Sequence, residues 1–157
     1  MKSETQKHGQ MHYVHFAIMM VLSFIAMFAF MYAMVDRFAN VYPNLNQFYM
    51  AGLMVAPMAI FEMVLMGAMY PNRSVNIAIM AASAIALGLF WFGIRDQAAV
   101  SDDQFLKSMI PHHAGAILMC QQAPIRDPEI RKLCGQIISS QQAEIDQMKR
   151  IMKRLDK

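Results

Sequence analysis

The distribution of apolar residues along the chain separates three long hydrophobic segments from a more polar C-terminal part. The segments run from about residue 11 to 35, from 48 to 70 and from 75 to 94. Each is close in length to the roughly 20 apolar residues that an α-helix needs to cross the hydrocarbon core of a bilayer. We therefore expect residues 1–100 to form a transmembrane domain of three helices, with the lipid bilayer as its surroundings.

The second and third segments carry features that are typical of helices packed inside a membrane. Pro57 lies within the second segment, where neighbouring helices can satisfy the backbone groups that a proline leaves free. The third segment is rich in alanine, glycine and serine, which let helices approach one another closely.

A different pattern begins after residue 100, where apolar residues recur at helical spacing among charged ones. Ser101 or Asp102 is a suitable N-cap for a helix that reaches about Gln122. Asp127, followed by Pro128 and an acidic residue, is the expected start of a second helix. Residues 101–157 are thus predicted to form an antiparallel helical hairpin outside the membrane.

Such a hairpin is too small to bury a useful core by itself. About 55 residues lie near the lower limit for a stable domain, and each helix would leave an apolar stripe in water. We therefore predict an all-α fold in which two hairpins pair into a ferritin-like four-helix bundle, so that the chain forms a homodimer or a higher homo-oligomer.

Composition and charge narrow the classes of function. Hydrophobic residues make up 57% of the sequence and charged residues 16%, which suits an apolar environment. The net charge of +3 is spread along helical faces, so we expect no nucleic acid partner. Because the sequence contains no nucleophile elbow, phosphate loop, dinucleotide fingerprint or HExxH motif, we expect neither an enzyme nor an organic cofactor.

The strongest candidate chemistry lies in the first helix of the hairpin. At about 100° per residue, its imidazole, thioether and thiol side chains fall within an arc of about 120°. These candidate metal ligands are Met109, His112, His113, Met119 and Cys120. Folding the hairpin brings the two histidines opposite Gln141, which either holds a metal ligand in place or makes a buried His–Gln hydrogen bond.

The high methionine content of the sequence favours binding of a soft metal ion. The sequence has 18 methionines among 157 residues. Thioethers select monovalent copper or silver over hard cations. We therefore expect Cu(I) or Ag(I) as the bound ion.

The membrane segments hold a second set of candidate ligands. One helical face at the start of the first segment carries His8, His12, His15 and Met19, and a stripe in the second segment carries Met54, Met58, Glu62 and Met66. An ionisable residue inside a membrane segment is a functional candidate by default. The alternatives are that the histidines are interfacial polar groups, and that Glu62 bonds to a neighbouring helix while methionine fills space.

The two cysteines, Cys120 and Cys134, are expected on facing stripes near the hairpin turn, about one helical turn out of register. A disulfide within or between chains is one use for them. Two thiolates acting as additional soft ligands are the other.

The hairpin resembles the family catalogued as domain of unknown function 305. The resemblance covers about residues 102–152 and rests on the run from Phe105 to His113, on Ala116, Ile117 and Met119, and on Ile137, Gln141, Gln142, Glu144, Ile145 and Met148. It implies a ferritin-like bundle, periplasmic binding of copper or silver, and a role in copper resistance. It also implicates Met109, His112, His113, Met119 and Met148 as ligands.

The same resemblance bears on location and assembly. It implies a bacterial inner-membrane protein with a cytoplasmic N-terminus and a periplasmic hairpin, whereas basic residues flanking the segments are balanced and assign no orientation. The sequence departs from the family at Cys120 and Cys134, where small residues are common. It contains one hairpin, whereas some members repeat it, which strengthens the expectation of a dimer.

Three functions therefore stay open. The first is a membrane-anchored Cu(I) or Ag(I) binder for copper sequestration, handling or resistance, which would pass metal to another copper-handling protein. The second is an oligomeric metal transporter component that uses Glu62 and the Met and His stripes. The third is a structural oligomerisation module in which methionine serves only for packing. A di-iron oxidase is disfavoured, because Glu129 and Glu144 do not precede a histidine by three residues.

Overall fold

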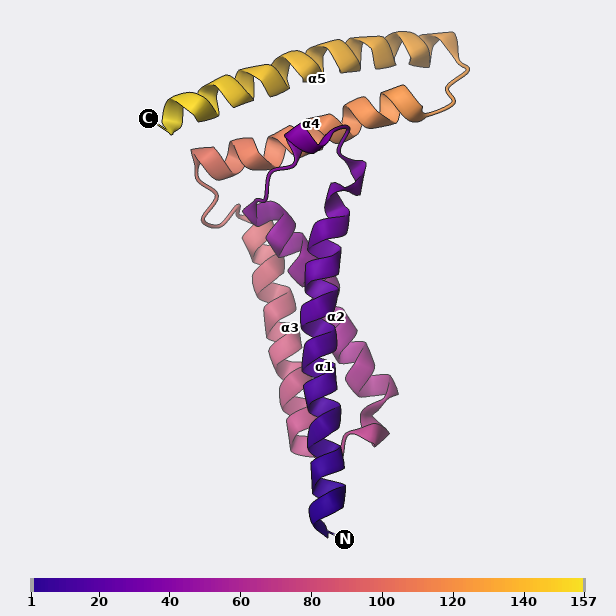
Figure 1. The fold of residues 1–157 in the computed structure, drawn as a ribbon, viewed down its shortest axis with the longest axis vertical. Helices are drawn as coiled ribbons and strands as arrows, with labels where there is room; N and C mark the ends of the chain where they lie inside the picture. The colour runs from indigo at the N-terminus through magenta and orange to yellow at the C-terminus, as the bar shows by residue number, and fades with distance from the viewer. Residues whose placement is uncertain (1, 157) are drawn as a thin grey trace. The chain divides into compact units, whose positions relative to one another are not determined.

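The computed structural model describes the backbone of residues 2–156 and the side chains of residues 11–156, and it confirms the all-α expectation (Figure 1). The described residues contain no strand. The α-helices are α1 (Lys2–Phe30), α2 (Leu45–Leu65), α3 (Arg73–Arg95), α4 (Asp102–Gln122) and α5 (Pro128–Leu155). The short 3₁₀ helices are η1 (Met31–Met34), η2 (Phe38–Asn40) and η3 (Gly67–Met69).

Three helical stretches, Met11–Met34, Leu45–Leu65 and Arg73–Arg95, are long and apolar enough to cross a membrane. The second begins earlier than the sequence suggests, because the Asn44 side chain caps it by accepting a hydrogen bond from the Gln47 amide at 3.0 Å. It also ends earlier, at Leu65, where the chain tightens into η3 at Gly67 instead of continuing to about residue 70.

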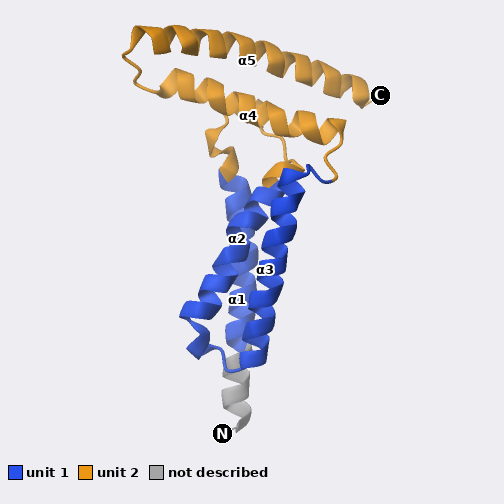
Figure 2. Cartoon of the chain, turned by 180° about the vertical axis from the view of Figure 1, so that it is seen from behind, with its two compact units in different colours: residues 1–30, 48–98 blue, residues 31–47, 99–157 orange. Residues whose placement is uncertain are grey.

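The chain divides into two compact units (Figure 2). Unit 1 contains residues 1–30 and 48–98, and unit 2 contains residues 31–47 and 99–157. The segment 31–47 links α1 to α2, and the sequence predicts it as part of the N-terminal domain. It belongs instead to the same compact unit as the α4–α5 hairpin.

Unit 1 consists of α1, α2 and α3 lying side by side (Figure 1). A cavity of about 310 Å³ lies between these helices, with a lining that is almost entirely apolar and includes Phe16, Ala56 and Ala82. At Gly52 the backbone of α2 lies so close to the Phe90 ring of α3 that an added Cβ would overlap the ring. At one end, the Tyr13 hydroxyl donates to the Asn76 side-chain oxygen at 2.7 Å.

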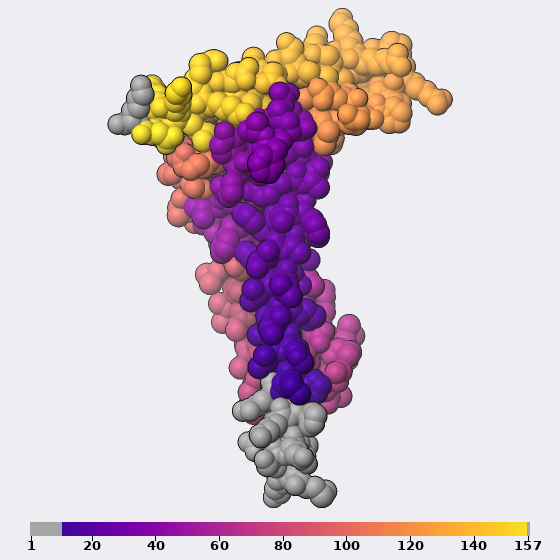
Figure 3. Space-filling view, in the orientation of Figure 1, coloured from indigo at the N-terminus to yellow at the C-terminus, as the bar shows by residue number. Residues whose placement is uncertain are grey.

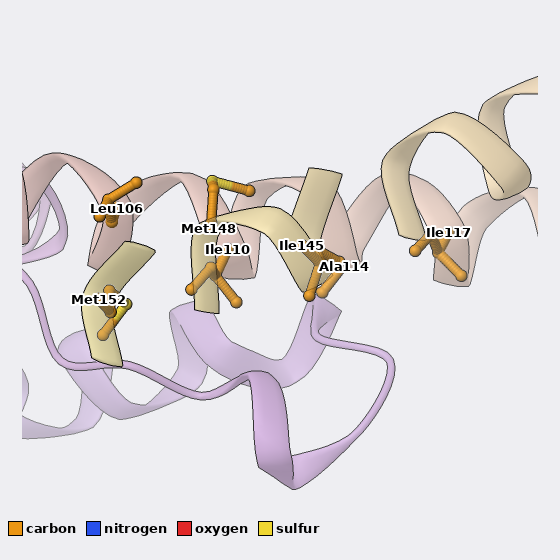
Figure 4. Packing of buried hydrophobic residues seen from close by; sticks show 7 residues of the cluster. All are labelled: Leu106, Ile110, Ala114, Ile117, Ile145, Met148 and Met152. Atoms are coloured by element: carbon orange, nitrogen blue, oxygen red, sulfur yellow. The ribbon is translucent and has the colours of Figure 1, made fainter. Parts of the chain in front are cut away.

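Unit 2 has a hydrophobic core between α4 and α5. The side chains that form it point toward one another from the two helices (Figure 4): Leu106, Ile110, Ala114, Ile117, Ile145, Met148 and Met152. The predicted caps are present, since Ser101 accepts from the Gln104 amide and Asp127 accepts from the amides of Glu129 and Ile130. The expected antiparallel hairpin is therefore formed.

The segment 31–47 covers part of this hairpin (Figure 3). Val35 and Tyr42 pack against the core. The Lys149 ammonium group donates to the Ala39 carbonyl at 3.0 Å and to the side-chain oxygen of the buried Asn40 at 2.6 Å. The hairpin therefore shields part of its apolar surface with residues of its own chain, a contribution that the sequence argument for a four-helix bundle left out.

A second group of hydrogen bonds ties the same segment to α4. The Asn44 side-chain amide donates to the Lys107 carbonyl at 3.3 Å. The Leu45 backbone N–H donates to the side-chain oxygen of Gln104 at 3.0 Å. Asn44 is itself buried, so these bonds satisfy a polar group that water does not reach. They fix the N-terminal half of α4 against the chain that enters α2.

Candidate metal-binding face of the hairpin

His113 links the two helices of the hairpin. The residue is 7% exposed, with Nδ1 2.8 Å from the Met109 carbonyl oxygen and Nε2 2.7 Å from a carboxylate oxygen of Glu144. A carbonyl only accepts, so Nδ1 carries a proton and donates it. Both ring nitrogens are thus engaged within the protein.

This pairing differs from the expected one between a histidine and Gln141. Glu144 lies three residues further along the same face of α5, and a carboxylate is the stronger acceptor for an imidazole. Gln141 is left with a buried side-chain oxygen that has no hydrogen-bond partner among the described residues.

The outer face of α4 carries the donors that remain available. His112 is exposed, its ring lies 6.0 Å from that of His113 in an edge-on arrangement, and it makes no hydrogen bond among the described residues. Met119 is 53% exposed, and Met109 is half-buried against the edge of the core. One imidazole and two thioethers therefore share this face, which we call the α4 donor face.

Met148 lies elsewhere. It is part of the buried cluster between α4 and α5, beside Ile110 (Figure 4). Its thioether thus contributes to packing in this structure. Because α4 rises about 1.5 Å per residue, Met109 and Cys120 are also about 16 Å apart along its axis. The structure does not gather the six candidate ligands of the hairpin around one point.

The two cysteines lie near the closed end of the hairpin, Cys120 in the last turn of α4 and Cys134 in the second turn of α5. Both are free thiols and both are half-buried. A hydrogen bond between the two thiols and, to a lesser degree, burial raise the pKa of Cys120 above its ordinary value.

Clusters of other ligand types are missing from the described residues. No group of three or more histidine, cysteine, aspartate or glutamate side chains there is arranged to hold a metal ion.

The candidate ligands on α1 and α2 are spread along the helices. His15 and Met19 are exposed, whereas His12 is half-buried with its ring edge-on to Tyr70 at 6.3 Å. The side chain of His8 lies outside the described residues. On α2, Met54 is exposed and Met58 is half-buried, and Met66, just after the end of α2, is exposed.

Glu62 lies in the last turn of α2, near the end of this helix rather than in the interior of a segment. A carboxylate oxygen of Glu62 accepts a hydrogen bond from the Tyr70 hydroxyl at 2.9 Å. Tyr70 belongs to the connection between α2 and α3, and Tyr13 packs against its ring. The position of Glu62 favours the alternative in which it bonds to a neighbouring part of the fold.

Two features of the site were missed from the sequence. From the sequence, Glu144 enters the family resemblance and is a disfavoured di-iron ligand, but it is not recognised as the partner of His113. Asn40 and Asn44, which anchor the segment 31–47, looked like ordinary polar residues of a short connection. Their burial depends on contacts with distant parts of the chain.

Residues 93–152 match the family described as Domain of unknown function (DUF305). The chain is also similar to a viral protein, Uncharacterized protein L153 of Acanthamoeba polyphaga mimivirus. The two are 34% identical over 138 residues, which cover 86% of this chain and 89% of the viral protein. No solved structure matches the chain.

Proposed function

The chain belongs to the DUF305 family, and from this premise we propose that it is a membrane-anchored protein that binds Cu(I) or Ag(I) for copper sequestration, handling or resistance. The observation that carries this proposal is the α4 donor face, where Met109, His112 and Met119 share one side of a well-anchored helix. His112 is exposed and free of hydrogen bonds among the described residues, so its imidazole is available to a ligand.

The chemistry of these side chains suits a soft monovalent ion. Thioether sulfur and neutral imidazole are ligands for Cu(I), and neither brings the charge that would attract Mg²⁺ or Ca²⁺. Met109 and His112 are three residues apart on α4 and can share one ion, with Met119 as a further donor about two turns along the helix. His113 acts as a positioning residue, because its bond to Glu144 fastens α4 to α5.

The test uses the full-length protein in detergent micelles, competing with a chromophoric chelator for Cu(I). The triple variant Met109→Leu, His112→Ala, Met119→Leu removes the three donors and should weaken binding at least about tenfold, which corresponds to about 1.4 kcal/mol. Phe105→Leu is the matched control, since Phe105 is exposed on α4 but has no donor atom. Equal affinity of the wild type and the triple variant would remove the α4 donor face from the proposal.

We also propose that two chains associate through their hairpins into a four-helix bundle. Exposed apolar side chains on α4 and α5 support this, because they are unusual on a helix pair that stays in water. They are Phe105, Met119, Ile130, Leu133 and Leu155. Light scattering of the detergent-solubilised protein should give a dimer, and Ile130→Lys with Leu133→Lys should shift it toward the monomer, whereas Lys132→Ala should not. A wild-type monomer at all concentrations would contradict the bundle.

For location, we propose a bacterial inner membrane with the N-terminus cytoplasmic and the hairpin periplasmic. If α1, α2 and α3 each cross once, residues 31–47 and 99–157 fall on the same side, as their membership in one compact unit requires. A C-terminal epitope tag should then be digested by protease added to spheroplasts. Protection of the tag would reverse the orientation. A periplasmic hairpin is also where a second copper-handling protein would collect the metal.

The transporter alternative receives less support from unit 1. Glu62 is bonded to Tyr70, and the cavity between the three helices is lined mostly by apolar side chains. The transporter alternative would be supported if proteoliposomes that contain the protein took up metal and Glu62→Gln abolished this uptake.

A further inference from the structure

The α4 donor face is part of a longer stripe along α4. At about 100° per residue, five positions spaced alternately by four and three residues fall within an arc of about 80°. Two of them are about half exposed, His112 is exposed, and the others are half-buried. We call these residues the α4 stripe: Phe105, Met109, His112, Ala116 and Met119. This spacing is typical of a helix face that packs against another helix.

The other sides of α4 are covered within unit 2. Ile110 is fully buried against α5. On a second side, a Cβ added at Gly115 would lie 3.4 Å from the Met34 carbonyl oxygen. The segment 31–47 therefore packs on one side of the hairpin, and the α4 stripe lies on the opposite side.

A second apolar stripe lies on α5. Ile130, Leu133 and Leu155 are each about half exposed and fall within an arc of about 60°. Lys149, which bonds to the segment 31–47, lies at least about 100° from this arc. The stripes of α4 and α5 thus share the side of the hairpin that the segment does not cover.

The composition of the α4 stripe suits a contact with a second copy of the chain. None of its five residues is an aspartate, glutamate, lysine or arginine, and charged residues are depleted at the centre of protein interfaces. Most homo-oligomers are built about two-fold axes, where one surface meets its own copy. A residue at the middle of such a surface lies close to its own counterpart.

His112 is the midpoint of the α4 stripe, seven residues from Phe105 and seven from Met119. When two copies of the stripe overlap completely, His112 is level with His112 of the second copy, whether the two α4 helices run parallel or antiparallel. No other residue of the stripe has this property in both directions. The imidazole that is available to a ligand therefore lies where two chains meet.

Charge favours the antiparallel direction. The first turn of α4 carries Asp102 and Asp103, and Arg126 is exposed just after the end of this helix. Antiparallel overlap brings the acidic turn of each copy toward Arg126 of the other. Parallel overlap would bring the two acidic turns to the same end.

We propose that one Cu(I) or Ag(I) ion is held between two copies of the chain, by Met109 and His112 of each copy. The ion class and the use of the α4 donor face rest on the proposed function, and the new element is that the second copy supplies half of the ligands. Met109 precedes His112 by three residues, about 4.5 Å along the axis, so both reach one point. Met119 lies about 10 Å further along α4, at the end of the stripe.

This arrangement couples metal binding to assembly. Helical bundles build metal sites from side chains on facing helices, and here the facing helix belongs to the second copy. An ion that binds the paired form must strengthen pairing by the same factor by which pairing strengthens ion binding. The ion stays monovalent and meets neutral ligands, so no electron is transferred.

The first experiment uses the wild-type, full-length protein in detergent. Sedimentation equilibrium with and without Ag(I) measures the dissociation constant of the dimer, and equilibrium dialysis counts bound ions. The count is taken as the difference from His112→Ala, which cancels binding elsewhere in the chain. We expect one ion per two chains and a dimer dissociation constant at least about tenfold lower with Ag(I).

The second experiment disrupts pairing without removing a donor. Ala116→Lys places a charge within the α4 stripe and should weaken both dimerisation and Ag(I) binding at least about tenfold. Ala143→Lys is the matched control, because Ala143 is exposed on α5 and points away from α4, so both constants should stay unchanged. If Ala116→Lys does not fold, Ile130→Lys with Leu133→Lys disrupts pairing from α5 and should weaken Ag(I) binding as well.

The outcomes separate the shared site from the proposed function. One ion per chain, bound equally well by the wild type and by a monomeric variant, would overturn the shared site and leave the α4 donor face standing. A dimer whose dissociation constant does not respond to bound Ag(I) would overturn it too. Equal binding by the wild type and the triple variant Met109→Leu, His112→Ala, Met119→Leu would instead remove the α4 donor face itself.

Discussion

Unit 1 and unit 2 enclose different kinds of side chain. In unit 2, Ile110, Ile117 and Ile145 are almost completely enclosed between α4 and α5. In unit 1, the enclosed residues of α2 are mostly alanine and glycine, while large side chains such as Leu89 and Trp91 point outward. Water drives large apolar groups together, whereas lipid is as apolar as they are and leaves close contact between small residues as the main source of order. The two units therefore depend on different residues for their stability.

The comparison is tested most strongly by a matched pair of truncations. Ile110→Ala removes a side chain that is 0% exposed and should destabilise unit 2 by about 2 to 5 kcal/mol. Leu89→Ala, in an outward position on α3, should stay within about 0.5 kcal/mol. Hydrogen exchange in detergent, followed separately for α4 and α3 amides, measures both effects. Equal losses in the two units would show that the comparison is wrong.

The docking of residues 31–47 makes the next largest prediction. Lys149→Met removes two hydrogen bonds and leaves the buried side-chain oxygen of Asn40 without its donor, at a cost of about 1 to 3 kcal/mol. Limited proteolysis should then cut the chain between residues 36 and 44 more quickly. Lys153→Met serves as the control, because Lys153 is exposed. An unchanged cutting rate would mean that the segment does not need this anchor.

Unit 1 has its own sensitive position at Gly52. An added methyl group meets the Phe90 ring and forces it to move, so Gly52→Ala should destabilise the α2–α3 contact by about 1 kcal/mol. Gly88→Ala meets nothing within 4 Å and should be neutral or stabilising. Thermal unfolding in detergent compares the two variants. If both behave alike, close approach at Gly52 does not hold unit 1 together.

The smallest expected effect concerns the thiol pair of unit 2. Cys134→Ala removes the hydrogen bond that is the main cause of the raised pKa of Cys120. The Cys120 pKa should fall toward its ordinary value, so a larger fraction is thiolate at mildly alkaline pH and alkylation should be a few-fold faster. The rate of iodoacetamide labelling as a function of pH measures this. A slower or unchanged rate would show that Cys134 does not control Cys120.

Features of the fold that depend on nearby residues were predictable from the sequence. The three apolar helices follow from segment length, and the start of α5 follows from Asp127 and Pro128. The end of α2 was predicted less well, and this placed Glu62 in the interior of a segment although it lies in the last helical turn. A few residues at a helix boundary thus changed the setting of a candidate ligand.

Features that depend on distant residues were not predictable in the same way. Lys149 and Asn40 are 109 positions apart, and the residues around each of them do not indicate which residue it bonds to. Glu144 and Gln141 share a face of α5, so the pairing of His113 with one of them depends on the register of the hairpin. Methionine is ambiguous for a chemical reason, since a thioether such as that of Met148 serves equally as a ligand and as core packing.

The order of synthesis gives the docked segment 31–47 a further significance. These residues leave the ribosome long before Lys149, so the side-chain oxygen of Asn40 has no lysine donor until α5 has been made. The bonds of this segment to α4 can form earlier, whereas its bonds to Lys149 are among the last to form. A nascent chain stalled before α5 should therefore carry an open, protease-sensitive connection after α1, and completion of α5 should close it.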